Sequence, residues 1–348
     1  MKSLTWMFVV VVLILAGSCK KKDSPFPEPK PKPEEEITQP ELVLLVEKMT
    51  LKEFYTLTPP DEPAFEQELI HHYIPEYSAD SLLVKVTVQF EPSAVFDWSS
   101  AQDTYDSYEY EAGRLVKHNL YRRRNTSPQD PIELVNYYTY TYNEKGNVNS
   151  TSFYSSRRVP PNGDFAFRET NQTTYQYDSQ QRITRADRLS FDYVGDDGTV
   201  KISSWANRTE YVYNSDGNIE KEIGYFGFDA NRDEVVTDDE VEKETETVYS
   251  GYSEHPNPAY HSGLLTTGNL LGLFPLFKHL PETAVKNAFN LPGDMPSTLT
   301  ATDTYTTTYR DDGYPSHIQL ELENKYLDQS GVVNTQKQHK VMEFRYRE

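Results

Sequence analysis

A short unit built on a Tyr-x-Tyr pair returns along much of the chain, and it constrains the fold more than any other feature. Its copies, in chain order, are YEYEAGRL, YTYNEKGNV, YQYDSQQRI, YVYNSDGNI and TTYRDDGYP. The second tyrosines of the first four copies stand at positions 110, 142, 177 and 213, so these copies are 32, 35 and 36 residues apart. Self-similarity at such a period indicates a repeated supersecondary unit.

Each copy predicts a strand, a tight turn and a second strand. Alternating Tyr and Thr, as in YTYTY from Tyr138 to Tyr142, is typical of a β-strand with one bulky face. Asn214 at the first turn position and Gly217 at the fourth predict a type I turn that ends in a left-handed residue. Gln181 replaces that glycine in the third copy, where a positive φ would cost about 1 kcal/mol.

The segments VPPNGD, VGDDG and DANRDEVVTDDE predict return turns between the copies, so that each period holds two strands. Segments before the first copy and after the last copy also alternate in the manner of strands. The fold class is therefore all-β. We expect a single large antiparallel up-and-down meander of about a dozen strands, forming a soluble barrel or half-barrel.

One insertion, residues 261–293, interrupts the repeat with the sequence HSGLLTTGNLLGLFPLFKHLPETAVKNAFNLPG. It is the most apolar part of the chain after residue 40. Pro281 opens the stretch PETAVKNAF, and a proline at that place predicts a short helix. The insertion is expected to be a helical, apolar plug that fills the core. The alternative is an exposed segment that binds a partner.

The N-terminus predicts export and a lipid anchor. Lys2 and the 11 apolar residues 6–16 are typical of a signal peptide, and the run is too short for a membrane helix of about 20 residues. The stretch AGSC resembles the lipobox of bacterial lipoproteins, which implies that Cys19, the only cysteine, carries the acyl chains. We expect a signal peptide over 1–18, the acylated cysteine and a tether rich in Pro and charge over 19–40, and an antiparallel β domain over 41–348.

Composition limits the partners. The formal net charge is -20, which argues against nucleic acid, because binding to nucleic acid rests on neutralising phosphates with Lys and Arg. The 26 Tyr and 16 Phe residues argue for a folded domain, since disordered chains are poor in aromatics. We expect no nucleic-acid partner and contact with the membrane through the lipid anchor.

Two further segments resemble a known family. The Tyr-x-Tyr-Asn-x-x-Gly-x-Ile unit resembles YD-repeat sequences, and LFKHLPETAV followed by YTTTYRDDGYPSHI is similar to Bacteroidetes lipoproteins of unknown function with a porin-like fold. The opening CKKKDS resembles lipoproteins of that phylum that are displayed on the cell surface. The resemblance implies an outer-membrane lipoprotein and brings no catalytic residue. We do not expect a membrane-spanning pore, because the strand after Asn218 carries charge on both faces.

The acidic segment DANRDEVVTDDE has the ligand spacing of an EF-hand calcium loop. The positions that would supply oxygen ligands are Asp229, Asn231, Asp233, Val235 through its carbonyl, Thr237 and Glu240. Glu234 stands at the sharp turn where an EF-hand has glycine, which would strain the loop and weaken binding. Two interpretations stay open, a weak calcium site and an acidic hairpin tip that binds no metal. No other cofactor is expected.

The sequence lacks the Gly-x-Ser-x-Gly, P-loop and His-Glu-x-x-His motifs that mark common enzyme classes. We therefore expect a non-enzymatic binding or structural module, with a glycan or another cell-surface protein as partner. Rows of exposed tyrosine that stack on sugar rings would make it a glycan-binding lipoprotein of a polysaccharide-utilisation system. The competing class is a hydrolase that uses a pair of carboxylates.

Overall fold

The computed structural model describes residues 45–57, 65–91, 104–123, 131–159, 164–194, 200–257, 277–289, 297–327 and 333–347. The chain divides into two units, Met1–Leu42 and Val43–Glu348, and every described residue belongs to the second. The predicted signal peptide, Cys19 and the tether lie outside the described residues, as do residues 261–276 and 290–293 of the apolar insertion.

The described residues form sixteen β-strands and no helix. No described segment has the helical length and hydrophobicity that a membrane crossing requires. The strands are β1 (Val46–Leu57), β2 (Phe65–Tyr77), β3 (Leu83–Phe90), β4 (Thr104–Glu111), β5 (Arg114–Arg123), β6 (Ile132–Tyr142), β7 (Val148–Val159), β8 (Asp164–Tyr177), β9 (Ile183–Val194), β10 (Val200–Tyr213), β11 (Ile219–Phe228), β12 (Val241–Pro256), β13 (His279–Ala288), β14 (Ser297–Tyr309), β15 (Pro315–Leu327) and β16 (Val333–Tyr346).

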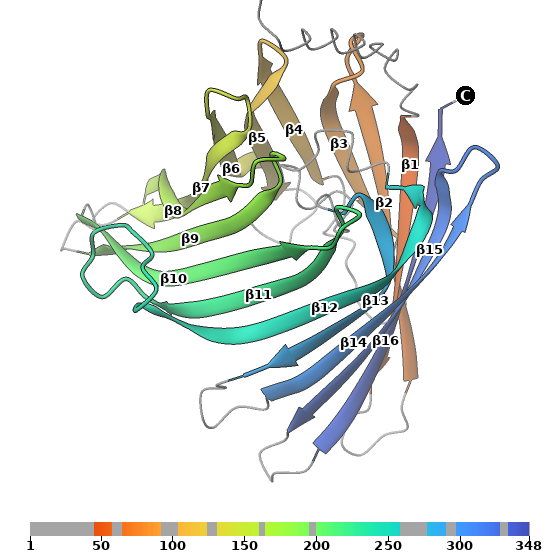
Figure 1. Cartoon of the computed structure of the whole chain (residues 1–348). Helices are drawn as coiled ribbons and strands as arrows, with labels where there is room; N and C mark the ends of the chain where they lie inside the picture. Colours follow the sequence, from red (N-terminus) through yellow and green to blue (C-terminus); the bar gives the residue numbers. More distant parts are fainter. Residues whose placement is uncertain are drawn as a thin grey trace, which may run out of the picture. The chain divides into compact units, whose positions relative to one another are not determined.

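The strands form one antiparallel meander that closes into a barrel (Figure 1). Each strand pairs with its neighbours in the sequence, and β1 pairs with β16, where Met49 lies opposite Phe344. The predicted all-β meander is thus confirmed, and of the two expected forms the structure has the closed barrel. The sequence predicts about a dozen strands, whereas the described residues contain sixteen. Strands β2 and β13 carry no Tyr-x-Tyr pair and were not predicted.

Antiparallel order gives the barrel two different rims. The tight turns β2–β3, β4–β5, β6–β7, β8–β9, β10–β11 and β14–β15 all lie at one rim, which we call the turn rim. The first residue of β1 and the last of β16 lie at this rim too, because β1 leads away from it and β16 returns to it. The connection β11–β12, residues 229–240, lies at the opposite rim, which we call the loop rim.

Five of these six tight turns share one hydrogen-bond pattern, as the sequence predicts, and the shorter β4–β5 turn instead has positive φ at both Ala112 and Gly113. In the turn of the copy YVYNSDGNI, the Asn214 N–H donates to the Asn218 carbonyl at 2.9 Å, and the Gly217 N–H donates to the Asn214 carbonyl at 3.1 Å. Gly217 has a φ of 85°, and Gln181 takes the same left-handed conformation at 64°, as expected. The turn that begins at Ser78 has the same bonds and a φ of 62° at Ser81, so it is a further copy that the sequence comparison missed.

A tyrosine hydroxyl joins five of these turns to a later strand. In each case a tyrosine donates to the carbonyl of a residue just after the turn, and Tyr142, Tyr177 and Tyr213 are the second tyrosines of their copies. We call this contact the tyrosine lock. It joins Tyr142 to Leu115, Tyr177 to Val148, Tyr213 to Ile183, Tyr252 to Ile219 and Tyr346 to Pro315. Burial raises the pKa of Tyr177 to about 12, so its hydroxyl keeps the proton that it donates.

A large cluster of buried side chains lies on the face that carries the repeat tyrosines. One cluster joins β3 to β6 through Leu83, Val86, Val88, Tyr108, Leu115 and Tyr140. The register places Tyr211 and Glu222 on this face and Arg208 on the opposite face. The β11–β12 loop lies over the side that holds Arg208, which is the outer side of the barrel (Figure 1). The tyrosine face is therefore the inner face.

The prediction of a helix at PETAVKNAF is wrong, since Pro281 to Ala288 of this stretch belong to β13. Pro281 is accommodated because β13 pairs with β12 there, whereas pairing with β14 begins only at Thr283. Proline has no backbone N–H to donate, and at position 281 there is no pairing with β14 that would require one. Ala284 and Leu280 are buried, and Phe277 packs edge-on against Tyr249 with ring centroids 4.7 Å apart. The rest of the predicted plug is not among the described residues.

We predict that Tyr213→Phe lowers the free energy of unfolding by about 1 kcal/mol, because the Ile183 carbonyl loses its hydroxyl donor. Urea unfolding followed by circular dichroism measures the difference. Tyr137→Phe is the matched control, since the Tyr137 ring lies on the outer face and its hydroxyl makes no hydrogen bond with the described residues. Equal stability of the two variants would show that the tyrosine lock adds nothing.

Candidate functional site

The loop between β11 and β12 is the largest described departure from the repeat. Asp229 begins it and is 3% exposed. One carboxylate oxygen of Asp229 accepts the Arg232 N–H at 2.7 Å, and the other accepts the Glu234 N–H at 3.0 Å and the Ser203 hydroxyl. The carboxylate therefore organises the first half of the loop by binding its backbone.

Later residues repeat this pattern. The Asn231 side chain accepts the Asp233 N–H at 2.8 Å, and the Asp233 carboxylate accepts the Val235 N–H at 2.9 Å. Glu234 has a φ of 61°, so the residue in place of the EF-hand glycine does take the strained left-handed conformation. At the end of the loop, one oxygen of Glu240 accepts both the N–H and the hydroxyl of Thr237.

The structure thus brings the six predicted calcium positions into one loop, but it does not gather their carboxylates. Among the described residues, no group of three or more His, Cys, Asp or Glu side chains is placed to hold a metal ion. The oxygens of Asp229 already bind backbone N–H groups. Calcium binding would have to draw Asp233 and Glu240 toward Asp229, and it stays a prediction. Cys19, the predicted lipid anchor, is not among the described residues.

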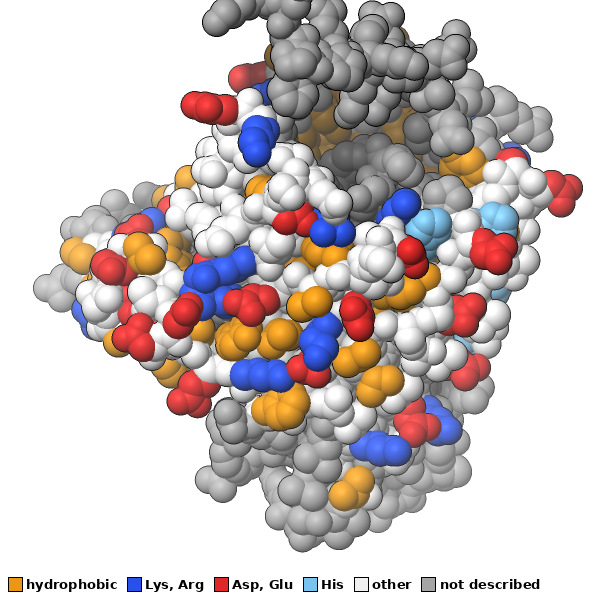
Figure 2. All heavy atoms as spheres, viewed as in Figure 1, with side chains coloured by type: hydrophobic (Ala, Val, Ile, Leu, Met, Phe, Trp, Pro, Cys, Tyr) orange, Lys and Arg blue, Asp and Glu red, His pale blue; other side chains and the backbone are white. Residues whose placement is uncertain are grey.

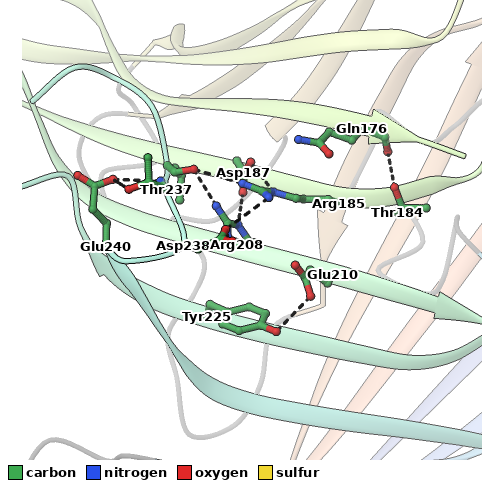
Figure 3. Close-up of polar contacts among 11 residues, drawn as sticks. Gln176, Thr184, Arg185, Asp187, Arg208, Glu210, Tyr225, Thr237, Asp238 and Glu240 are labelled. Atoms are coloured by element: carbon green, nitrogen blue, oxygen red, sulfur yellow. Dashed lines mark hydrogen bonds and ion pairs between the residues drawn. The ribbon is translucent and has the colours of Figure 1, made fainter.

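Two arginines fix the loop onto the outer face of the sheet (Figure 3). Arg208, on β10, is 3% exposed and donates from Nε to Asp187 at 2.8 Å and from Nη2 to the Val236 carbonyl at 2.7 Å. Its Nη1 binds the Asp238 carboxylate. Arg185, on β9, donates to the other oxygen of Asp187 at 2.7 Å and to the same Val236 carbonyl at 3.2 Å. We call these four side chains and this carbonyl the arginine clamp.

The outer face around the arginine clamp carries charge as well as apolar groups. Figure 2 shows basic and acidic side chains interleaved with hydrophobic ones over β9 to β12. Lys221 and Lys243 both contact Glu246, at 3.3 Å and 2.6 Å. Val236 packs into a small cluster with Leu189 and Ala206, so the loop is held by burial as well as by charge.

An exposed aromatic cluster lies on the inner face near the loop rim. Trp205 contacts Phe226 and Phe228 with ring centroids 5.1 Å and 4.6 Å apart. Trp205 is 43% exposed and Phe228 is 54% exposed. The register between β10 and β9 shifts between Ser203 and Ala206, and Trp205 stands within this bulge. Bulges near barrel rims re-aim side chains, and this one directs the indole toward the two phenylalanines.

Two carboxyls of the inner face are unusual in their protonation. Burial raises the pKa of Glu222, on β11, above its ordinary value, and Tyr249 donates to it at 3.4 Å. Burial likewise raises the pKa of Asp303, on β14, which accepts the Tyr305 hydroxyl at 3.3 Å. Lys286 acts electrostatically on both carboxyls. Sequence reasoning did not single out these residues, because alternation places them on a strand face without showing what surrounds them.

Comparison with known proteins gives likenesses of fold. No family model and no curated protein matches the chain. A porin-like protein from Bacteroides uniformis is 12% identical with a TM-score of 0.45, and the match covers 87% of this chain and 98% of that one. A porin-like protein from Bacteroides vulgatus is 17% identical with a TM-score of 0.42, over 87% of this chain and 99% of that one. A protein of unknown function from Bacteroides fragilis is 13% identical with a TM-score of 0.29, over 41% and 89%.

If the β11–β12 loop binds calcium, millimolar CaCl₂ will raise the melting temperature, because a ligand that binds only the folded state stabilises it. Magnesium at the same concentration should give a smaller rise, since it holds its water more tightly. Asp233→Asn is the test variant and should abolish the rise, and Asp216→Asn, in the β10–β11 turn, is the control. No shift with calcium in the unmodified chain would eliminate the site.

We predict that Glu222→Gln stabilises the barrel at pH 8 and has no such effect near pH 4. A carboxyl whose pKa is raised on folding contributes stability below its unfolded pKa, and this contribution is lost as the pH rises through the folded pKa. The amide removes that loss and can still accept the Tyr249 hydroxyl. Urea midpoints across the pH range measure it. Glu323→Gln is the control, because contact with Lys337 lowers the pKa of Glu323, and it should give no gain at pH 8.

Proposed function

We propose that the chain is a lipid-anchored barrel displayed on the cell surface, where it binds glycans without turning them over. The observation that carries the proposal is the exposed cluster of Trp205, Phe226 and Phe228. The rings of Trp205 and Phe228 are exposed and that of Phe226 is half-buried, and exposed apolar patches of this kind often mark binding sites.

The chemistry of the aromatic cluster suits sugar rings. An indole and two phenyl rings offer flat apolar faces, onto which the C–H faces of pyranose rings can stack. The mutual contacts hold the rings in place before a ligand arrives, which reduces the entropy lost on binding. The register places the Asn207 amide on the same strand face, two residues from Trp205, where it can bond hydroxyl groups.

The repeat tyrosines, in contrast, support the barrel. Tyr108 and Tyr140 are buried, and the second tyrosine of most copies is committed to the tyrosine lock. The proposal therefore moves the glycan site from the tyrosine rows to the aromatic cluster.

Anchoring rests on the N-terminal sequence. Cys19 follows a signal-peptide pattern, and the Pro-rich residues 20–40 suit a semi-rigid spacer between membrane and barrel. Outward-facing charges support contact with the membrane through the anchor alone. Arg185 and Lys221 lie on the outer face, and each Arg or Lys that faced lipid at the centre of a bilayer would cost about 2–4 kcal/mol.

A carboxylate hydrolase is the second candidate, and the raised pKa values of Glu222 and Asp303 favour it. The two residues lie on β11 and β14, with β12 and β13 between them. At about 4.8 Å per strand, their backbones are about 14 Å apart, so the two side chains would have to extend toward each other to reach the about 5–9.5 Å between glycosidase carboxyls. We therefore keep binding without turnover as the first candidate.

Binding of fluorescent oligosaccharides to intact cells that produce the chain tests both parts of the proposal. Cells with the unmodified chain should capture at least one glycan of an array-derived panel. Trp205→Ala should lose about tenfold in affinity or more while the protein stays on the cells. Phe167→Ala, an exposed aromatic on the outer face, is the matched control and should bind normally.

Cys19→Ala should release the protein from the membrane fraction, and the purified protein should still bind the glycan. A Trp205→Ala variant that binds as well as the unmodified chain would contradict the site. Release of shortened sugars from the panel would contradict the absence of turnover and favour the hydrolase.

A further inference from the structure

A second concave site lies on the outer face of the barrel, away from the aromatic cluster. It is a cavity of about 290 Å³ between β8, β9 and the β11–β12 loop. Gln172, Thr174 and Gln176 line it from β8, and residues 234–236 line it from the loop. Figure 3 shows Gln176 on the strand beside Arg185, next to the arginine clamp.

The β8 side of the cavity is a row of unused hydrogen-bonding groups. Gln172, Thr174 and Gln176 alternate along one strand and so point to the same face, about 7 Å apart. None of the three side chains hydrogen-bonds another described residue, although most neighbouring polar groups do. Each amide and hydroxyl can both donate and accept. The row therefore matches a ligand that also donates and accepts along its length.

The charged groups at the cavity are already compensated. Arg185 binds Asp187 at 2.7 Å, and Asp187 also binds Arg208 at 2.8 Å. The arginine clamp holds two cations and two carboxylates, so its net charge is zero. Glu234 lies 3.6 Å from the Lys201 ammonium. An ionic ligand would have to break one of these pairs and leave a buried charge without its partner, which is costly, and the cavity thus favours an uncharged ligand.

The arginine clamp also holds the loop wall of the cavity in place before any ligand binds. Two guanidinium groups hold the Val236 carbonyl, and Val236 itself is buried against Leu189 and Ala206. The loop wall is therefore fixed in the free protein, as ligand sites usually are. The volume lies just below the roughly 300–1,000 Å³ of clefts for drug-sized ligands, so it suits a single ring.

We infer that this cavity binds one neutral polyhydroxyl molecule, such as a single sugar ring, through the side chains of Gln172, Thr174 and Gln176. The inference goes beyond the proposed function and does not rest on it, because Trp205 and its partners lie on the opposite face of the sheet.

Saturation-transfer NMR with methyl α-glucoside, methyl α-galactoside and methyl α-mannoside as separate probes tests the inference. At least one glycoside should receive saturation from the unmodified chain. The double variant Gln172→Leu/Gln176→Leu should weaken its binding about tenfold or more, because two hydrogen-bonding partners are lost. An unchanged urea midpoint will show that the double variant folds, since both side chains touch the cavity and no other described hydrogen-bond partner.

Gln336→Leu is the matched control, an exposed glutamine on β16 far from the cavity in the barrel order, and it should bind as the unmodified chain does. Trp205→Ala should also keep the glycoside signal, which separates this site from the aromatic cluster. The inference is overturned if no glycoside is saturated, if the double variant binds normally, or if Trp205→Ala removes the signal. Displacement of the glycoside by inorganic phosphate would overturn the neutral ligand class.

Discussion

The tyrosine lock is the contact on which the rest of the barrel depends. A hydroxyl from one hairpin reaches a carbonyl just after the turn of an earlier one, so five of the tight turns are fixed by a neighbour as well as by their own hydrogen bonds. Cation–ring contacts reinforce the same rim, since Arg182 lies 4.3 Å from the centroid of the Tyr213 ring. These links act together with the ladder bonds and with buried packing, such as the cluster that joins β3 to β6, to fix the register between hairpins. The sheet positions its binding groups because its register is fixed at the turn rim.

Local chemistry made much of this fold predictable. The β10–β11 turn is set by local groups, since the Asn214 side chain accepts a backbone N–H within the turn and Gly217 takes a positive φ. Gln181 could be recognised as strained because it stands where the other copies have glycine. Closure could not be predicted in this way, because no local pattern shows that Met49 will pair with Phe344. PETAVKNAF has the residues of a helix start, but pairing with β12 overrides that preference. The loop residues were found by their spacing, whereas the clamp depends on Arg208 and Asp187, which meet only through the register of β9 and β10.

Candidate binding groups appear where the repeat is interrupted, and the reason is physical. Within the repeat, Tyr108 and Tyr140 are buried and the hydroxyls of Tyr142, Tyr177 and Tyr213 are bound in the tyrosine lock, so few groups are left to meet a ligand. The pairing of β10 with β9 is irregular between Ser203 and Ala206, and the exposed ring of Trp205 lies at this bulge. The β11–β12 loop covers one end of β8 and β9 and thereby encloses Gln172 and Gln176. The regular part of the barrel supplies rigidity, and its two irregularities supply surfaces of different chemistry on opposite faces of one sheet.

Closure of the meander by β1 and β16 has a consequence for the order in which the chain folds. Every other pairing joins strands that follow each other, and such contacts form quickly because short loops cost little entropy. The closing pair joins opposite ends of the domain, and a tenfold longer loop costs about 2 kcal/mol more to close. Until β16 has been made, β1 is paired only with β2, and the backbone groups along its other edge have no strand partner. The newly made sheet is therefore open to strand exchange and aggregation for most of its assembly, and its last strand is the one that ends this exposure.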